Sequence, residues 1–330
     1  MASPTSTLPL PGATRRTLLP ALPFAPSVIA SLLAVYLIWS STFLVLRYMV
    51  AELPPLATSG IRFLIAGSIL YAFLRFRGAA APTGKQWLLS VASGTLMFFV
   101  GNGFVAIAAR EVPSGMTAMS IGSVPLFLSV MEAPFGQRPT ALQWVGIALG
   151  FAGVACMGWS EGSASPGALA LLFFAAIGWA SASLLVRRAA MPAGLMAGAT
   201  QLIGGGSMLI LGGFALGERF TAMPSWSAGL AFVYLLVFGS IIGFSAAVHL
   251  LRNAPASVAT SYAYVNPVLA VVLGAMVGGE RIAPSALLAG LLVVAGVAVL
   301  MTSEARKHRA ASSVVTANAV QPASAERAAA

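Results

Sequence analysis

The stretch Arg252 to Pro267, RNAPASVATSYAYVNP, repeats the frame of Arg110 to Pro125, REVPSGMTAMSIGSVP, which lies 142 residues upstream. Each stretch has an Arg, a Pro three residues later, a run of small residues and a second Pro inside a long apolar segment. Further echoes at nearly the same spacing pair Trp39 to Arg47 with Trp179 to Arg187, and Arg62 to Leu70 with Gln201 to Leu209. The chain is therefore predicted to be a duplicated unit.

The composition excludes a soluble globular domain. Of the 330 residues, 58% are hydrophobic and only 8% are charged, whereas ordinary soluble domains carry about 25% charged residues. The mean hydropathy of +0.91 indicates an all-α integral membrane protein with the lipid bilayer as its surroundings. The net charge of +10 comes mainly from Lys and Arg between and after apolar runs, so it requires no nucleic-acid partner.

Ten apolar runs have the length that a membrane helix needs, which is about 20 residues for a bilayer core of roughly 30 Å. They are Ser27 to Leu46, Leu56 to Leu74, Leu88 to Ala109, Val112 to Met131, Ala141 to Trp159, Ala168 to Val186, Ala193 to Leu216, Trp226 to Leu250, Pro255 to Gly278 and Pro284 to Met301. The sequence thus predicts ten transmembrane helices in two five-helix repeats, residues 27–159 and 168–301. Residues 1–26 and 302–330 are expected to be disordered cytoplasmic tails.

The distribution of basic residues predicts the orientation in the membrane. With the N-terminus in the cytoplasm, thirteen Lys and Arg residues face the cytoplasm, against Arg47, Arg110, Arg219 and Arg281 on the other side. Both termini are therefore expected to be cytoplasmic. Because each repeat has an odd number of spans, the second copy enters the membrane from the opposite side. Inverted repeats of this kind build many secondary transporters, with the substrate site near the midplane.

Several motifs resemble those of the EamA family of the drug/metabolite transporter superfamily. They are WSSTFLVLR in the first span, GNGFVAIAAR, VPSGMTAMSIGSVP and the closing stretch from Asn266 to Met301, and the resemblance covers roughly residues 27 to 301. It implies a multi-pass transporter of the bacterial inner membrane that exports small metabolites, amino acids or drug-like compounds by alternating access. Gln137 stands in the first copy where Glu280 stands in the second, which favours a loop-structuring role for Glu280.

Aromatic and polar side chains inside the spans form the predicted substrate site. Tyr262 and Asn266 are four residues apart and so share one helix face, and their polar groups would be costly against lipid. Trp39 and Trp179 lie at matched mid-span positions, although aromatic stripes also serve as packing or interfacial belts. The full predicted set is Trp39, Phe43, Asn102, Trp179, Ser183, Tyr262 and Asn266.

Four further residues are candidates for gating or coupling. Arg62 lies inside the second span, where a charge must snorkel, pair or face water; it either reaches the outer surface or binds an anionic substrate group. Pro125 and Pro267 are expected mid-helix, as hinges or as packing kinks. Glu132 either exchanges a proton or is an interfacial residue near Arg138.

The leading prediction is a secondary transporter for amino-acid-like or amphipathic, drug-like metabolites, because the chain has no nucleotide-binding loop. Protons are a candidate coupling ion, and no cofactor or metal is expected. The alternatives are a non-transporting membrane scaffold and an intramembrane serine hydrolase using Ser160 and His249. Ser160 belongs to GWSEG, which fits the nucleophile pattern but follows a membrane helix rather than a strand.

Overall fold

The computed structural model describes residues 25–157, 164–281, 283–304 and 306. All regular structure in these residues is helical, as expected. Eight helices are long and apolar enough to cross a membrane, and two shorter apolar helices accompany them. The GWSEG segment with Ser160, most of both predicted tails and Trp159 lie outside the described residues.

The helices follow the apolar runs closely. Their bounds are α1 Pro26–Val50, α2 Pro55–Phe76, α3 Gly84–Gly94, η1 Thr95–Gly103, α4 Phe104–Ala108, α5 Ser114–Ile121, α6 Val124–Glu132, η2 Ala133–Phe135, α7 Ala141–Met157, α8 Pro166–Arg188, α9 Leu195–Ala215, α10 Trp226–Tyr234, η3 Leu235–Ile242, α11 Gly243–Asn253, α12 Ala256–Ala259, α13 Tyr262–Met276 and a last helix, Pro284–Glu304. Helix starts are marked by Pro in the first turn of α1, α2 and α8 and by a Thr83–Gln86 capping box at α3.

Two of the long helices contain a π-helical segment. The rod α3–η1–α4 carries one in η1, and the rod α10–η3–α11 carries one in η3. A π segment inserts extra residues into a helical turn and is frequent at functional sites. The two segments lie in the third apolar run of each half of the chain, a match that the hydropathy pattern does not reveal.

Two other spans are broken rather than kinked. The fourth is interrupted at Gly122 and Ser123, between α5 and α6, and the ninth at Thr260 and Ser261, between α12 and α13. Pro125 is therefore not mid-helix as expected but in the first turn of α6, where its missing N–H costs little. Pro267 does lie inside α13.

The two broken spans cross near their prolines. A methyl group at Gly122 would lie 3.0 Å from Cγ of Pro267, so the absence of a side chain at Gly122 lets the spans approach. Such irregular backbone is tolerated at membrane depth only inside the protein or against a cavity.

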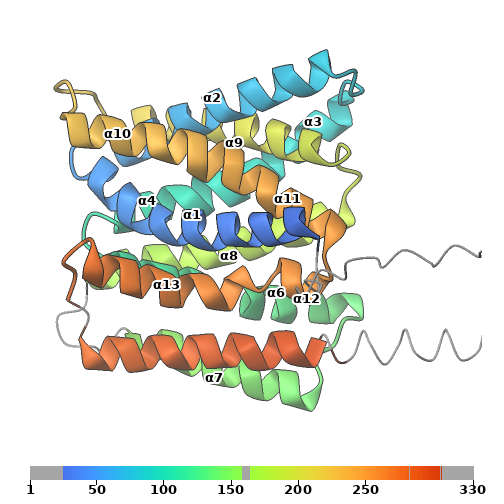
Figure 1. Ribbon diagram of the computed structural model, residues 1–330, viewed down its shortest axis with the longest axis vertical. Helices are drawn as coiled ribbons and strands as arrows, with labels where there is room; N and C mark the ends of the chain where they lie inside the picture. Colours follow the sequence, from blue (N-terminus) through green and yellow to red (C-terminus); the bar gives the residue numbers. More distant parts are fainter. Residues whose placement is uncertain (1–24, 158–163, 282, 305, 307–330) are drawn as a thin grey trace, which may run out of the picture.

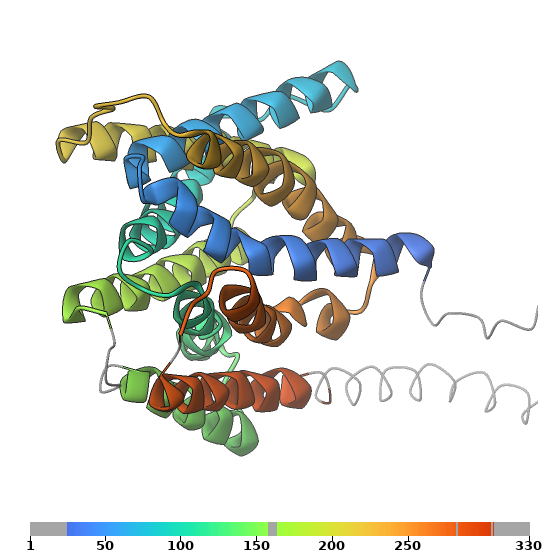
Figure 2. The same ribbon diagram turned by 60° about the vertical axis from the view of Figure 1, so that its left-hand side comes forward.

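The helices run side by side across the molecule (Figure 1). We call the left end in Figure 1, with the α1–α2 turn, the α1–α2 end, and the right end, with the α2–α3 turn, the α2–α3 end. Helix α2 packs along α9, and α7 packs along the last helix at one edge of the bundle (Figure 2). Glycines allow these contacts: a methyl group at Gly60 would lie 2.7 Å from the carbonyl oxygen of Gly206, and one at Gly146 would lie 2.7 Å from that of Gly296.

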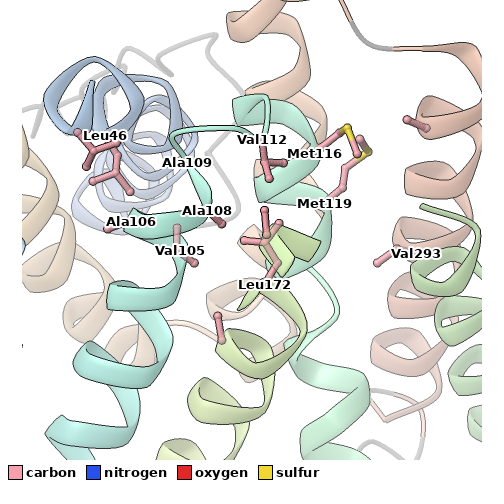
Figure 3. Packing of buried hydrophobic residues seen from close by; sticks show 14 of the residues in the cluster. Leu46, Val105, Ala106, Ala108, Ala109, Val112, Met116, Met119, Leu172 and Val293 are labelled. Carbon is pink, nitrogen blue, oxygen red and sulfur yellow. The ribbon is translucent and has the colours of Figure 1, made fainter. Parts of the chain in front are cut away.

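A buried apolar core extends inward from the α1–α2 end. Side chains from α1, α4, α5, α8 and the last helix meet there (Figure 3). The labelled members are Leu46, Val105, Ala106, Ala108, Ala109, Val112, Met116, Met119, Leu172 and Val293. Leu46 and Val105 also line a cavity between the two halves of the chain, so the core borders this cavity.

Candidate functional site

The cavity between the two halves of the chain has a volume of about 220 Å³. Its walls come from α1, α2, η1, α4, α5 and α6 in the first half and from α8, α9, η3, α11 and α13 in the second. Both π segments and both broken spans contribute to it. The cavity is therefore bounded by the least regular backbone of the bundle.

Most of the residues singled out from the sequence line this cavity. Six of the seven predicted substrate-site residues do so: Trp39, Phe43, Asn102, Trp179, Tyr262 and Asn266. Three of the four gating candidates, Arg62, Pro125 and Pro267, line it as well. These residues come from distant parts of the sequence and meet around one space.

Two predicted residues lie elsewhere. The Ser183 hydroxyl donates a hydrogen bond of 2.8 Å to the carbonyl of Trp179, one turn earlier in its own helix, and does not line the cavity. Glu132 lies at the end of α6 and pairs with Arg187 at 2.9 Å, not with Arg138. That pair is at the α2–α3 end, and the Arg187 side chain is 58% exposed, so it contributes little to stability.

Among the described residues of the cavity wall, Arg62 is the one that is charged. Its side chain does not snorkel: the residue is 5% exposed, and its Nε is buried without a hydrogen-bond partner. The guanidinium lies over the ring of Phe63, 4.1 Å from the ring centroid. A buried cation without a counter-charge is costly, so an anionic group entering the cavity would gain an unusually strong electrostatic interaction.

Seven of the lining residues are aromatic: Trp39, Phe43, Phe63, Phe98, Trp179, Phe244 and Tyr262. Trp39 and Tyr262 meet edge to face, with ring centroids 5.0 Å apart, and Phe98 contacts Phe63 at 4.6 Å and Trp179 at 6.4 Å. Pairs of this geometry hold each ring in place. The rings offer a rigid apolar surface beside the Arg62 guanidinium.

Two amides add neutral polar groups. Asn266 is 6% exposed, and its Oδ1 is buried without a hydrogen-bond partner. Asn102 donates only a long bond of 3.4 Å from Nδ2 to the carbonyl of Met97. Buried polar atoms normally have partners, so the Oδ1 atom of Asn266 and the Nε atom of Arg62 are available to a bound molecule.

Carboxylates tie the helices together at the α1–α2 end. Glu280, with a side chain 1% exposed, pairs with Arg47 at 2.7 Å and accepts hydrogen bonds from the backbone and hydroxyl of Ser114 at the start of α5. Glu218 accepts bonds from the amides of Leu56 and Ala57 at the start of α2. Anionic groups are favourable at helix N-termini. Each of these carboxylates belongs to the second half of the chain and caps a helix of the first.

Two more carboxylates make the reverse connection, from the first half to the second. Glu52 accepts bonds from the backbone and hydroxyl of Ser225, which precedes α10, and these bonds hold the pKa of Glu52 below its ordinary value. Glu111 accepts a bond from the hydroxyl of Ser165, which precedes α8. The sequence led us to expect a structuring role for Glu280 but gave no indication of one for Glu218, Glu52 or Glu111.

Among the described residues, no group of three His, Cys, Asp or Glu side chains comes together. His249 lies in α11, where its Nδ1 is 3.3 Å from Nδ2 of Asn253, and it does not line the cavity. Its proposed partner Ser160 is outside the described residues.

The model of the EamA-like transporter family matches this chain twice, over residues 26–159 and 166–302. The chain belongs to the EamA-like transporter family. It is thus a membrane-spanning transporter, which implies a small-molecule substrate and lipid surroundings.

Named relatives agree with this assignment. The inner membrane transporter YedA of Escherichia coli (strain K12) is 41% identical over 300 residues, covering 90% of this chain and 96% of that protein. The transporter YvbV of Bacillus subtilis (strain 168) is 25% identical, covering 90% of this chain and 99% of that protein. A solved crystal structure, 21% identical, matches with a TM-score of 0.60 over 83% of this chain and 96% of that chain, which shows a shared fold.

Several residues of the cavity wall were not among the predicted site residues. Phe63 and Phe98 are apolar residues in apolar helices, with no signal of their own in the sequence. Gly243, which lies beside this wall, stands four residues after Gly239, and this G-x-x-x-G spacing is typical of helix-packing sites. Its neighbour is instead the ring of Trp39.

Proposed function

We propose that this chain is a secondary transporter that carries small amphipathic carboxylates, amino-acid-like metabolites among them, through the cavity between its two halves. The observation that carries the proposal is the buried guanidinium of Arg62, whose Nε has no partner and which faces an aromatic cavity with no Asp or Glu among its described lining residues. A permanent cation in this setting selects an anion.

The proposed binding mode follows from the positions of the polar atoms. A substrate carboxylate pairs with Arg62, which is well suited to bidentate contact with planar anions. The apolar part of the substrate lies against Trp39 and Trp179, and a donor group of the substrate bonds to Oδ1 of Asn266. Small ligands typically bind in apolar pockets with a few such convergent polar groups.

The architecture we propose is ten spans in two inverted repeats, with both termini in the cytoplasm of a bacterial cell. The two matches to one family model, the sequence echoes near a spacing of 140 residues and the thirteen-to-four distribution of basic residues all support it. In this orientation the α1–α2 end faces outward and the α2–α3 end faces the cytoplasm. We propose the inner membrane as its location, as in YedA.

Alternating access is the transport mechanism we propose. In this conformation the outer end is held by four carboxylate contacts between the two halves, whereas the cytoplasmic end has the half-exposed Arg187–Glu132 pair. Opening outward requires release of the outer contacts, and the broken spans at Pro125 and Pro267 supply places where the wall bends. Export then begins with loading from the cytoplasm.

None of the described lining residues of the cavity is Asp, Glu or His, which favours a site for proton coupling outside the cavity. Glu132, at the cytoplasmic end, remains the candidate from the sequence. The proposed cycle moves the substrate without changing it chemically, and it uses no cofactor or metal.

The experiment that tests the proposal compares carboxylates with their uncharged amides. Purified protein in nanodiscs is titrated with phenylacetate and phenylacetamide while its thermal unfolding is followed, because a ligand that binds the native state raises the melting temperature. We expect stabilisation by the carboxylate only. Equal stabilisation by both compounds, or by neither across a series of small carboxylates, would refute anion selection by Arg62.

A further inference from the structure

Two glycines face the two tryptophans of the cavity. Gly101, in η1, lies against Trp179 of α8, and Gly243, the first residue of α11 after η3, lies against Trp39 of α1. A methyl group at Gly101 would lie 2.6 Å from Nε1 of Trp179, and one at Gly243 would lie 2.6 Å from Nε1 of Trp39. Real side-chain contacts are not this short, so each indole occupies space that any other residue would fill.

The two contacts are matched across the duplication. Gly101 and Gly243 are 142 residues apart, and Trp39 and Trp179 are 140 apart, the spacing of the sequence echoes. Each pair also joins one half of the chain to the other. Gly101 of the first half faces the indole of Trp179 in the second half, and Gly243 of the second half faces the indole of Trp39 in the first. A chance packing contact would have no reason to recur in this way.

Backbone conformation does not explain these glycines. Gly243 has φ −60° and ψ −43°, values that every L residue adopts in a helix, and Gly101 is not among the residues with positive φ. Glycine weakens a helix interior compared with alanine. What the two sites require is therefore the absence of a side chain beneath an indole ring.

We infer that Gly101 and Gly243 determine the substrate specificity of the transporter by setting the width of the cavity; this inference rests on the proposed function. Without a side chain below them, the indoles of Trp179 and Trp39 lie back against the helix backbone and leave room between them. An alanine at either position pushes one indole into the cavity. Wide ligands are then excluded, while narrow carboxylates still reach Arg62.

Fluorine NMR on protein containing 5-fluorotryptophan tests the ring displacement without any ligand. The chain has six Trp residues, and Trp39→Phe and Trp179→Phe assign the two resonances of interest. We expect Gly101→Ala to shift the Trp179 resonance and not that of Trp39, and Gly243→Ala to do the opposite. The control is Gly229→Ala in α10, where a methyl group meets no atom within 4 Å. Unmoved indole resonances in both glycine variants would overturn the inference.

A ladder of carboxylates of increasing width tests specificity. Acetate, phenylacetate and 1-naphthylacetate are titrated against wild type, Gly101→Ala, Gly243→Ala and Gly229→Ala by thermal shift. We expect Gly101→Ala and Gly243→Ala each to lose at least about tenfold in affinity for 1-naphthylacetate and less than about twofold for acetate, because the shape of a pocket discriminates ligands by size at this scale. The double variant Gly101→Ala/Trp179→Phe, with a smaller ring over the new methyl group, should recover the lost affinity.

The outcomes separate the two proposals. A wild-type protein that binds none of the three carboxylates refutes the proposed function, and the NMR result still decides whether the glycines position the rings. If the wild type does bind them, two results refute the specificity role alone. One is that the affinities of the glycine variants fall in parallel for all three carboxylates, and the other is that Trp179→Phe does not reverse the loss.

Discussion

Glu280 caps the helix that begins at Ser114, which lies 166 residues earlier in the sequence: its carboxylate accepts one bond of 2.9 Å from the Ser114 amide and one of 2.8 Å from the Ser114 hydroxyl. Arg47 pairs with the same carboxylate at 2.7 Å. The corresponding residue of the first half, Gln137, is exposed. The two halves therefore differ in charge at corresponding positions, and the buried acid lies at the end proposed to be outside.

Glu280→Gln should destabilise the protein and favour opening of the outer end. The amide keeps the shape of the side chain but loses charge-assisted bonds to Arg47 and Ser114, and hydrogen bonds to charged groups contribute about 1.5–3 kcal/mol. Thermal unfolding in nanodiscs measures the loss. The matched control is Glu132→Gln, which neutralises the half-exposed pair at the other end and should change the melting temperature little. Equal losses in the two variants would contradict a special role for the Glu280 cap.

The contacts of Glu52 lead us to expect a small dependence of stability on pH, in one direction only. Because the Ser225 bonds hold its pKa below the ordinary value, the ionised form stabilises the folded protein at neutral pH, and this contribution is lost as the pH falls through the lowered pKa. Glu52→Gln should therefore lower the melting temperature slightly at pH 7 and make no difference at strongly acidic pH. Melting curves of both proteins over an acidic pH series check this. A difference that grows on acidification would show that the sign is wrong.

The two cavity prolines should behave differently. Pro267→Ala restores an N–H inside α13 that can bond to the carbonyl of Ala263, which straightens a wall proposed to move, so we expect normal insertion and slower flux. Pro125→Ala, in the first turn of α6, should have the smaller effect, because proline is well tolerated there. Flux in proteoliposomes at equal protein density compares them. Unchanged flux in the Pro267 variant would show that the proline only packs.

Cys156, the only cysteine in the sequence, tests the orientation without any mutation. It is exposed and lies next to the last residue of α7, at the end proposed to face outward. A membrane-impermeant maleimide added to intact spheroplasts should label it, and Cys156→Ser should abolish the labelling. Labelling that appears only after the membrane is permeabilised would reverse the proposed topology.

Much of the cavity could be predicted because duplication marks it in the sequence. Trp39 and Trp179 stand out through the 140-residue echo, and Tyr262 and Asn266 stand out as polar groups on one face of an apolar helix. Ser183 satisfies the same criteria and still lies elsewhere, because its hydroxyl bonds to the carbonyl of Trp179 in its own helix. Helical spacing identifies which residues share a helix face. It does not show whether the hydrogen-bonding group of a short side chain is already bonded to the backbone.

Other features depend on tertiary packing and leave no local signal. The π segments η1 and η3 have the same apolar composition as ordinary membrane helix, so hydropathy cannot locate them. Gly243 carries a packing motif, but its partner is an indole from a helix about 200 residues away in sequence. The ion pair between Arg47 and Glu280 joins residues 233 positions apart, and only the folded chain reveals it.

The most direct test of anion transport through this cavity is flux in proteoliposomes of wild type and Arg62→Gln. Liposomes loaded with acetate, phenylacetate and phenylalanine are followed for loss of each compound, with phenylacetamide as the uncharged comparison. Removing a buried charge whose Nε has no hydrogen-bond partner should leave the melting temperature unchanged or higher, so a loss of flux is not a loss of fold. We predict that wild type releases at least one of the carboxylates and that Arg62→Gln releases it at least about tenfold more slowly, the effect of about 1.4 kcal/mol. Carboxylate flux in Arg62→Gln equal to that of wild type would contradict the proposal.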